Sequence, residues 1–178
     1  MNIIGDKNVF AIEYIFFDET RETEIAMYIN NCNILEFERD GKILTTRWNL
    51  DDIALWLREF LDDMKEDPYP VECDGIYAAQ KDDNARDFDS EDDEEFDDYY
   101  DKIDEWNMYH RWHHVSSGAI LADVYFQLVG DYVEISWDNR DMGDGIVFKS
   151  EVGGSKVPVE IFCLVVDEFL KKYALHWF

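Results

Sequence analysis

The sequence predicts an α+β fold, with a mainly antiparallel sheet and two or three helices packed on it. Two groups of short apolar runs end at turn residues, and each group is followed by a stretch with helical periodicity. Strands followed by helices, in place of strict alternation, favour antiparallel pairing with the helices on one face. At 178 residues the chain is expected to form a single domain spanning 1–178, with one acidic, aromatic-containing insertion at 82–105.

Three features of the first 50 residues predict strands. Residues 9–17 (VFAIEYIFF) are rich in β-branched and aromatic side chains, which is typical of a strand buried on both faces. Residues 25–29 (IAMYI) form the next apolar run. Asp40-Gly41 accepts positive φ at both positions of a tight turn, so the segments that flank it are expected to pair as a hairpin.

The first helix is expected to begin at Asn49, whose side chain can accept a hydrogen bond from a free amide of the first turn. Asp67-Pro68 is expected to end it. Apolar residues at helical spacing form one stripe along it: Leu50, Ile53, Leu57, Phe60, Leu61 and Met64.

The middle of the chain is harder to assign. Residues 69–80 could hold a short strand, although Pro70 and Gly75 weaken that prediction. Residues 94–114 are expected to form a helix, because aromatic and apolar residues recur mostly at a spacing of three.

The last third of the chain predicts a second hairpin and a final helix. Alternating apolar residues on either side of Gly130-Asp131 predict the hairpin, with one buried face. Residues 146–149 are expected to form a strand and residues 152–155 a flexible link. The final helix is expected over 158–173, because a proline near a helix start supplies a preset φ.

Charge narrows the class of partner. Asp and Glu number 42 against 16 Lys and Arg, which gives a formal net charge of −26. Such a chain repels nucleic acid and anionic membrane surfaces, so we expect neither as a partner and expect a basic protein instead. The chain shows no signal sequence, no membrane-length apolar run and no cysteine spacing of a disulfide or zinc site, which favours the cytoplasm.

The insertion at 82–105 is the candidate binding segment. Isolated carboxylates are costly to bury, so an acidic run is expected to stay in water, and a solvated loop is the plainer alternative. Trp and Tyr are enriched at binding hot spots, although core packing is the alternative for each ring. The candidate partner-binding residues are Asp92, Asp93, Glu94, Glu95, Asp97, Asp98, Tyr99, Tyr100, Trp106 and Tyr109.

Evidence for catalysis or a cofactor is poor, so an enzyme is not expected. His110 and His114 could share a helix face and hold a metal, but no HExxH signature is present and packing is the preferred interpretation. An EF-hand loop starting at Asp87 would need glycine where Asp92 stands. The sequence contains no nucleophile elbow, Walker motif or dinucleotide-binding motif.

Residues 118–126 (GAILADVYF) and 130–139 (GDYVEISWDN) resemble segments of small bacterial proteins. The chain as a whole, compact, acidic and without catalytic signatures, resembles immunity proteins of bacterial polymorphic toxin systems. The resemblance implies an inhibitor that occludes a basic toxin domain. A general acidic adaptor or nucleic-acid mimic is the alternative, and a metal-dependent hydrolase using His110 and His114 is a further one.

Overall fold

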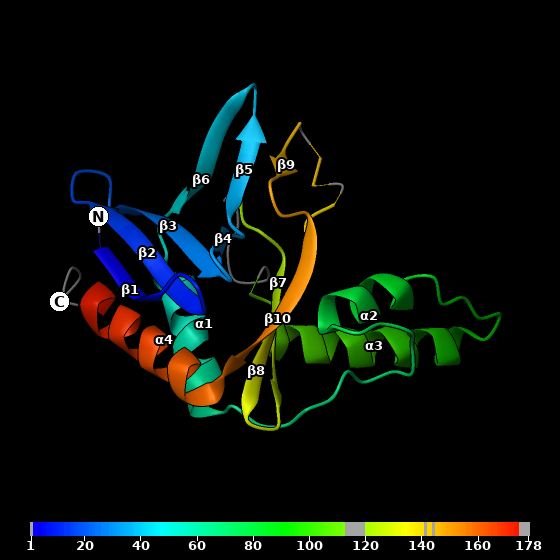
Figure 1. Cartoon of the computed structure of the whole chain (residues 1–178). Helices are drawn as coiled ribbons and strands as arrows, with labels where there is room; N and C mark the ends of the chain where they lie inside the picture. The colour runs from blue at the N-terminus through cyan, green and yellow to red at the C-terminus, as the bar shows by residue number, and fades with distance from the viewer. Residues whose placement is uncertain (1, 113–119, 141, 144, 175–178) are drawn as a thin grey trace.

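The computed structural model describes residues 2–112, 120–140, 142–143 and 145–174, and it confirms the α+β fold class. Helices cluster on both sides of the smaller of two sheets (Figure 1). In chain order the elements are β1 (Asn2–Asp6), β2 (Phe10–Phe17), β3 (Glu22–Ile29), β4 (Cys32–Asn33), β5 (Glu36–Arg39), β6 (Lys42–Trp48), α1 (Asp51–Asp62), α2 (Ala78–Ala85), α3 (Asp93–His110), β7 (Val124–Val129), β8 (Tyr132–Asp138), β9 (Val147–Phe148), β10 (Val152–Pro158) and α4 (Val159–Ala174).

The strands form two antiparallel sheets, where the sequence predicted one. The large sheet has the order β1-β2-β3-β6-β5-β9, and β4 pairs with β3. The small sheet has the order β10-β8-β7. Neighbouring strands pair in antiparallel orientation, as predicted. Short connections join most of these pairs, and a short connection brings the next strand back antiparallel.

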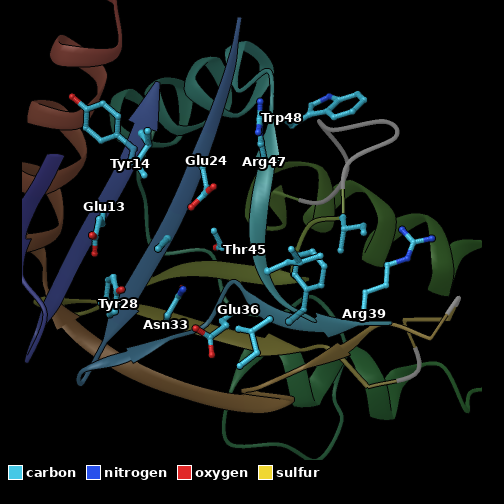
Figure 2. Close-up of a pocket in the computed structure, with 16 residues that line it drawn as sticks. Glu13, Tyr14, Glu24, Tyr28, Asn33, Glu36, Arg39, Thr45, Arg47 and Trp48 are labelled. Atoms are coloured by element: carbon cyan, nitrogen blue, oxygen red, sulfur yellow. The ribbon is translucent and has the colours of Figure 1, made fainter. Parts of the chain in front are cut away.

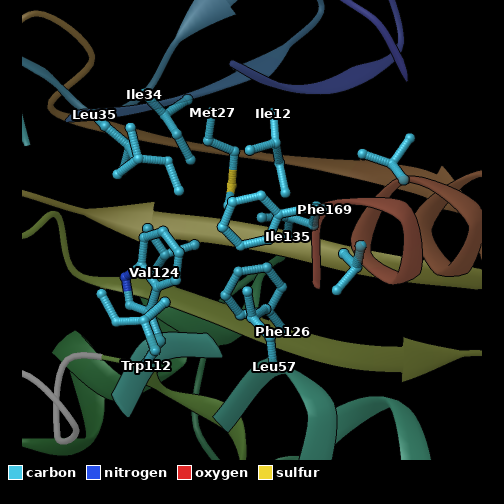
Figure 3. Close-up of a cluster of buried hydrophobic side chains, with 14 of the residues drawn as sticks. Ile12, Met27, Ile34, Leu35, Leu57, Trp112, Val124, Phe126, Ile135 and Phe169 are labelled. Carbon is cyan, nitrogen blue, oxygen red and sulfur yellow. The ribbon is translucent and has the colours of Figure 1, made fainter. Parts of the chain in front are cut away.

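The main core lies between the two sheets and is closed by α1 and α4. Figure 3 shows Ile12 and Met27 from the large sheet facing Phe126 and Ile135 from the small sheet. Aromatic side chains pack between the elements that enclose this core: the ring centroids of Phe10 in β2 and Phe162 in α4 lie 5.4 Å apart. Each sheet therefore buries one face against the same set of helices and against the other sheet.

The predicted hairpins and the first helix are confirmed. Asp40 and Gly41 have φ of 53° and 71° and join β5 to β6, as a tight primed turn requires. Helix α1 begins at Asp51, two residues after the predicted start, and Leu50 is its N-cap residue; Asn49 Oδ1 accepts a hydrogen bond from the Asp51 amide at 2.8 Å. The helix ends at Asp62, before the predicted stop at Asp67-Pro68.

Two sequence predictions are corrected, and one strand was missed. Residues 69–80 contain the start of α2 and no strand, and β1 was not predicted. Residues 152–155 are part of strand β10 and are not a flexible link. Glycine serves there because neighbouring rings cover the backbone: a Cβ on Gly154 would lie 2.5 Å from the Tyr77 ring.

The β7–β8 hairpin is buried on both faces, where one buried face was predicted. Its second face receives α2, whose first amides need acceptors that the helix cannot supply. Glu134 Oε1 accepts from the Ala78 amide at 2.8 Å, and Ser136 Oγ accepts from the Ala79 amide at 3.1 Å. Polar residues on a strand thus cap the start of a helix that is distant in sequence.

Asp82 attaches α2 and α3 to the small sheet. The residue is only 3% exposed, so the prediction that the whole acidic run stays in water is wrong at its first position. Its carboxylate accepts hydrogen bonds from Tyr69 (3.2 Å), Tyr125 (2.8 Å), Asn107 (2.8 Å) and Arg86 (3.0 Å). A buried carboxylate is tolerated when its oxygens are satisfied in this way.

We expect Asp82→Asn to lower the free energy of unfolding at pH 7 by about 2–3 kcal/mol, because it removes a charged acceptor from buried donors. Burial alone would raise the pKa of Asp82, but hydrogen bonds from Asn107, Tyr125 and Arg86 outweigh it and lower the pKa. Stability from a lowered pKa is present above the unfolded value of about 3.9 and is lost as pH falls through the folded value. In urea unfolding experiments, the difference in unfolding free energy between wild type and variant should therefore become smaller below about pH 4.

The control for this variant is Asp87→Asn on the exposed turn after α2. It should change the unfolding free energy by less than about 0.5 kcal/mol. Equal losses in the two variants would contradict the role given to Asp82.

Gly154→Ala should lower the free energy of unfolding by about 1–3 kcal/mol, because the added Cβ would lie 2.5 Å from the Tyr77 ring and either the ring or the strand must shift. Lys156→Ala, at an exposed position of the same strand, controls for the strand propensity of alanine. Chemical denaturation checks both variants. An unchanged free energy of unfolding in Gly154→Ala would show that the structure around β10 can shift to accept the added methyl group.

Candidate protein-binding face

The acidic segment folds into helix α3, and its first turn shows why. Asp92 is the N-cap residue, and its Oδ1 accepts from the amides of Glu94 (3.0 Å) and Glu95 (3.3 Å). Asp93, Glu94 and Glu95 place negative charge at the positive end of the helix. The predicted helix over 94–114 is therefore confirmed to His110; Arg111 is already extended, and residues 113 and 114 lie outside the described part of the chain.

Carboxylates crowd the exposed side of this helix. We define the acidic face as the exposed residues Asp92, Asp93, Glu94, Glu95, Asp97 and Asp98. Lys102 is the only lysine or arginine of α3, and it pairs with Asp98 at 2.6 Å. Carboxylates this close together make the local electrostatic potential strongly negative, and a cationic surface bound here would offset it.

Tyr99 and Tyr100 are half-buried and support the helix. The Tyr99 ring stacks on Phe88 with centroids 3.8 Å apart. The Tyr100 hydroxyl lies 3.0 Å from the carbonyl oxygens of both Arg86 and Phe88. These rings hold the chain before α3 against the helix, so each offers a partner only part of its surface.

Trp106 was predicted to be a binding residue, but the structure places it in the core. It is 4% exposed, its Nε1 donates to the Asp67 carbonyl oxygen at 3.0 Å, and its ring lies against Tyr69, His110 and Tyr125. A partner cannot reach a ring enclosed in this way. The signal available from sequence was helical phase, since Trp106 follows the buried Ile103 by three positions.

Tyr109 is 62% exposed and is free to contact a partner. Two further exposed apolar residues of α3, Met108 at 62% and Phe96 at 38%, were not among the predicted site residues. Met108 stands next to α1, because Trp56 Nε1 donates to its carbonyl oxygen at 3.3 Å. The C-terminal end of α3 therefore adds apolar surface to the charge at its N-terminal end.

His110 is buried, and its contacts are those of a packed residue. Nδ1 lies 2.8 Å from the Phe126 carbonyl oxygen, Nε2 lies 3.5 Å from an Asp67 carboxylate oxygen, and the ring stacks on Trp106. His114, the other metal candidate, lies outside the described residues. Within the described ranges, no three His, Cys, Asp or Glu side chains are grouped to hold a metal ion.

A second charged region lies between α2 and the small sheet, in a pocket of about 430 Å³. Its arginines are all engaged: Arg86 pairs with Asp82, Arg111 with Asp123, and Arg140 with Asp83 and Asp138. The Arg111–Asp123 and Arg140–Asp83 pairs join different segments of the fold, whereas the Arg86–Asp82 and Arg140–Asp138 pairs are local. The described part of the chain contains no helix of the length and apolarity needed to cross a membrane.

No family model matches the chain, and no curated protein matches it. Among solved structures, the chain is similar to CdiI from Burkholderia dolosa AUO158, with a TM-score of 0.48 and 13% sequence identity over 96% of this chain and 99% of that chain. The function proposed below rests on the residues of the acidic face and not on this likeness.

Asp92→Ala should lower the free energy of unfolding by about 1 kcal/mol and reduce the helical signal, because two first-turn amides lose their acceptor. Asp92→Asn retains a capping oxygen and should restore most of the loss. Far-ultraviolet circular dichroism with thermal unfolding checks both variants. An Asp92→Asn variant as unstable as Asp92→Ala would show that charge, and not capping, is what the helix needs.

Proposed function

We propose that this protein is an immunity protein that neutralises a basic toxin domain by occlusion, and that the acidic face of α3 makes the contact. It acts by binding in the cytoplasm, with no bond made or broken. The observation that carries the proposal is a preformed, capped helix whose exposed carboxylates are almost unopposed by cations. The partner is then a basic protein, and the net charge of −26 disfavours nucleic acid and anionic membranes as partners.

Charge on α3 would act mainly on the rate of encounter. Complementary potentials steer association up to about 10⁸–10⁹ M⁻¹s⁻¹ at low salt. A helix that is already folded pays little ordering entropy on binding, which favours affinity as well. This supports a face that captures a positively charged surface quickly, as an inhibitor of a toxin needs to do.

Affinity requires apolar anchors in addition to charge. Tyr109 and Met108, each 62% exposed, lie on the same helix as the acidic face, and Phe96 stands within it. Rings and thioethers adapt to a partner surface and exclude water from the polar contacts around them. We assign the steering to the carboxylates and the slow dissociation to these three side chains.

The alternative function is a general acidic adaptor or nucleic-acid mimic, in which the carboxylates of α3 take the place of phosphates. Competition with DNA for one basic partner distinguishes this alternative, because an immunity protein needs only its cognate toxin. The metal-dependent hydrolase gains no support from His110, whose two ring nitrogens lie near the Phe126 carbonyl oxygen and the Asp67 carboxylate.

The direct test begins with the neighbouring genes: the partner to express is a basic C-terminal domain of a large secreted protein, if one is encoded beside this chain. Asp93→Asn, Glu94→Gln and Asp97→Asn in one variant should slow its association at least about tenfold at low salt, and the rates should converge at high salt. Stopped-flow mixing across salt concentrations measures this. Co-expression with the toxin domain then reports whether protection of cell growth falls in parallel.

The matched control removes three carboxylates elsewhere: Asp18→Asn, Glu19→Gln and Asp40→Asn. All three positions are exposed and lie on turns of the large sheet. A control that slows association as much as the α3 variant would mean that net charge alone attracts the toxin. An association rate that does not change with salt concentration would contradict electrostatic steering.

A further inference from the structure

Outside the acidic face, the described chain carries a groove on the large sheet and a buried histidine at the end of α3. The groove has a volume of about 670 Å³, and Figure 2 shows Glu24 and Glu36 on its walls together with Arg39 and Arg47. Carboxylates and guanidinium groups share this surface, so its charge selects no class of ligand. The contacts of the histidine, His110, are more specific.

Both ring nitrogens of His110 face oxygen atoms that act as acceptors. Nδ1 lies 2.8 Å from the Phe126 carbonyl oxygen, and Nε2 lies 3.5 Å from a carboxylate oxygen of Asp67. A neutral imidazole carries one N–H, and the short contact to the carbonyl oxygen requires it on Nδ1. Nε2 of the neutral ring then directs a lone pair at the carboxylate. A second proton, on Nε2, turns the same contact into an ion pair.

Two further features around His110 favour a positive ring. The imidazole stacks on the Trp106 indole with centroids 4.1 Å apart and an interplanar angle of 17°, and an indole face attracts a cation. His110 is also the last residue of α3, where the helix dipole favours positive charge. Burial opposes the charge, because the residue is only 4% exposed. The carboxylate, the indole face and the helix end act together against this cost.

Asp67 is the titratable side chain that faces the ring. The other elements packed against His110 present uncharged groups: Phe60 of α1 lies edge-on with its centroid 6.4 Å away, and β7 presents a backbone carbonyl oxygen. The next residue along the chain, Arg111, is engaged with Asp123. Within the described ranges, a change in the charge of the ring is therefore felt first at Asp67.

The backbone of Asp67 is fixed, whereas its carboxylate can move. The backbone carbonyl oxygen accepts hydrogen bonds from Trp106 Nε1 at 3.0 Å and from Gln127 Nε2 at 3.1 Å. These bonds join the connection between α1 and α2 to α3 and β7. The carboxylate is 39% exposed, so it can turn toward water when the ring is neutral. Protonation of the ring thus decides whether this side chain also holds the end of α3.

We propose that His110 and Asp67 form a pH-sensitive latch at the C-terminal end of α3. Protonation of Nε2 closes the latch and fastens α3 to the connection between α1 and α2, and loss of that proton opens it. The turn of α3 that the latch holds also carries the exposed residues Met108 and Tyr109. The latch is a property of the free protein and does not depend on the toxin contact assigned to α3.

Stability should fall as pH rises through the titration of His110. A histidine that gains an anionic partner on folding binds its proton more tightly in the folded chain than in the unfolded one. The contribution of the latch is therefore complete below about pH 6.5, where a histidine in an unfolded chain is protonated as well, and it is lost as pH rises.

The test follows the ring nitrogen shifts of His110 by NMR in the full chain, from about pH 5 to about pH 9. An imidazolium gives two similar nitrogen shifts, and a neutral ring gives two well-separated ones. Asp67→Asn keeps the shape of the side chain and removes its charge, so it should move the titration midpoint to lower pH by at least about 0.5 unit. On acidification over the same range, Tm should also rise more in the wild type than in this variant.

The matched control is Asp63→Asn, at the exposed residue that ends α1, which removes one negative charge four residues earlier. It should leave the midpoint of His110 unchanged. In a His110→Gln background, Asp67→Asn should no longer alter the dependence of Tm on pH. An unchanged midpoint in Asp67→Asn would overturn the latch, and so would a ring that stays neutral down to about pH 5. An equal shift in Asp63→Asn would overturn it in favour of net charge.

Discussion

The structure depends on one buried carboxylate more than on any other polar group. Asp82 draws together Tyr69 from the segment before α2, Asn107 from α3 and Tyr125 from β7. Burial raises the pKa of both tyrosines, so their hydroxyls keep the protons that they donate. Without this joint, the most acidic helix among those described would be attached to the small sheet by a small apolar cluster around Ile103 and Trp106 and by the contact of His110 with the Phe126 carbonyl oxygen.

Local chemistry made half of the fold predictable. The Asp40-Gly41 turn, the stripe of α1 and the final helix follow from residues close together in sequence, and the structure agrees with each. Helix α2 and strand β10 were missed because their stability comes from distant partners. Glu134 and Ser136 cap α2, and Trp137 and Tyr77 lie against Gly153 and Gly154 of β10.

The candidate site was predictable as a helix but not as a surface. The composition of the sequence showed where the carboxylates cluster, and the predicted helix placed most of them on one element. Which aromatic residues face water depends on what packs beneath α3, and that is why Trp106 was placed wrongly and Met108 was missed.

The proposed function requires that α3 is a rigid, preorganised display of negative charge in the free protein. Amide hydrogen exchange of the isolated chain tests this most directly. The account predicts protection of the central amides of α3, from about residue 97 to 107, close to that of α4. Exchange of these amides at the rate of an unfolded chain would contradict it, because the acidic face would then form only on binding.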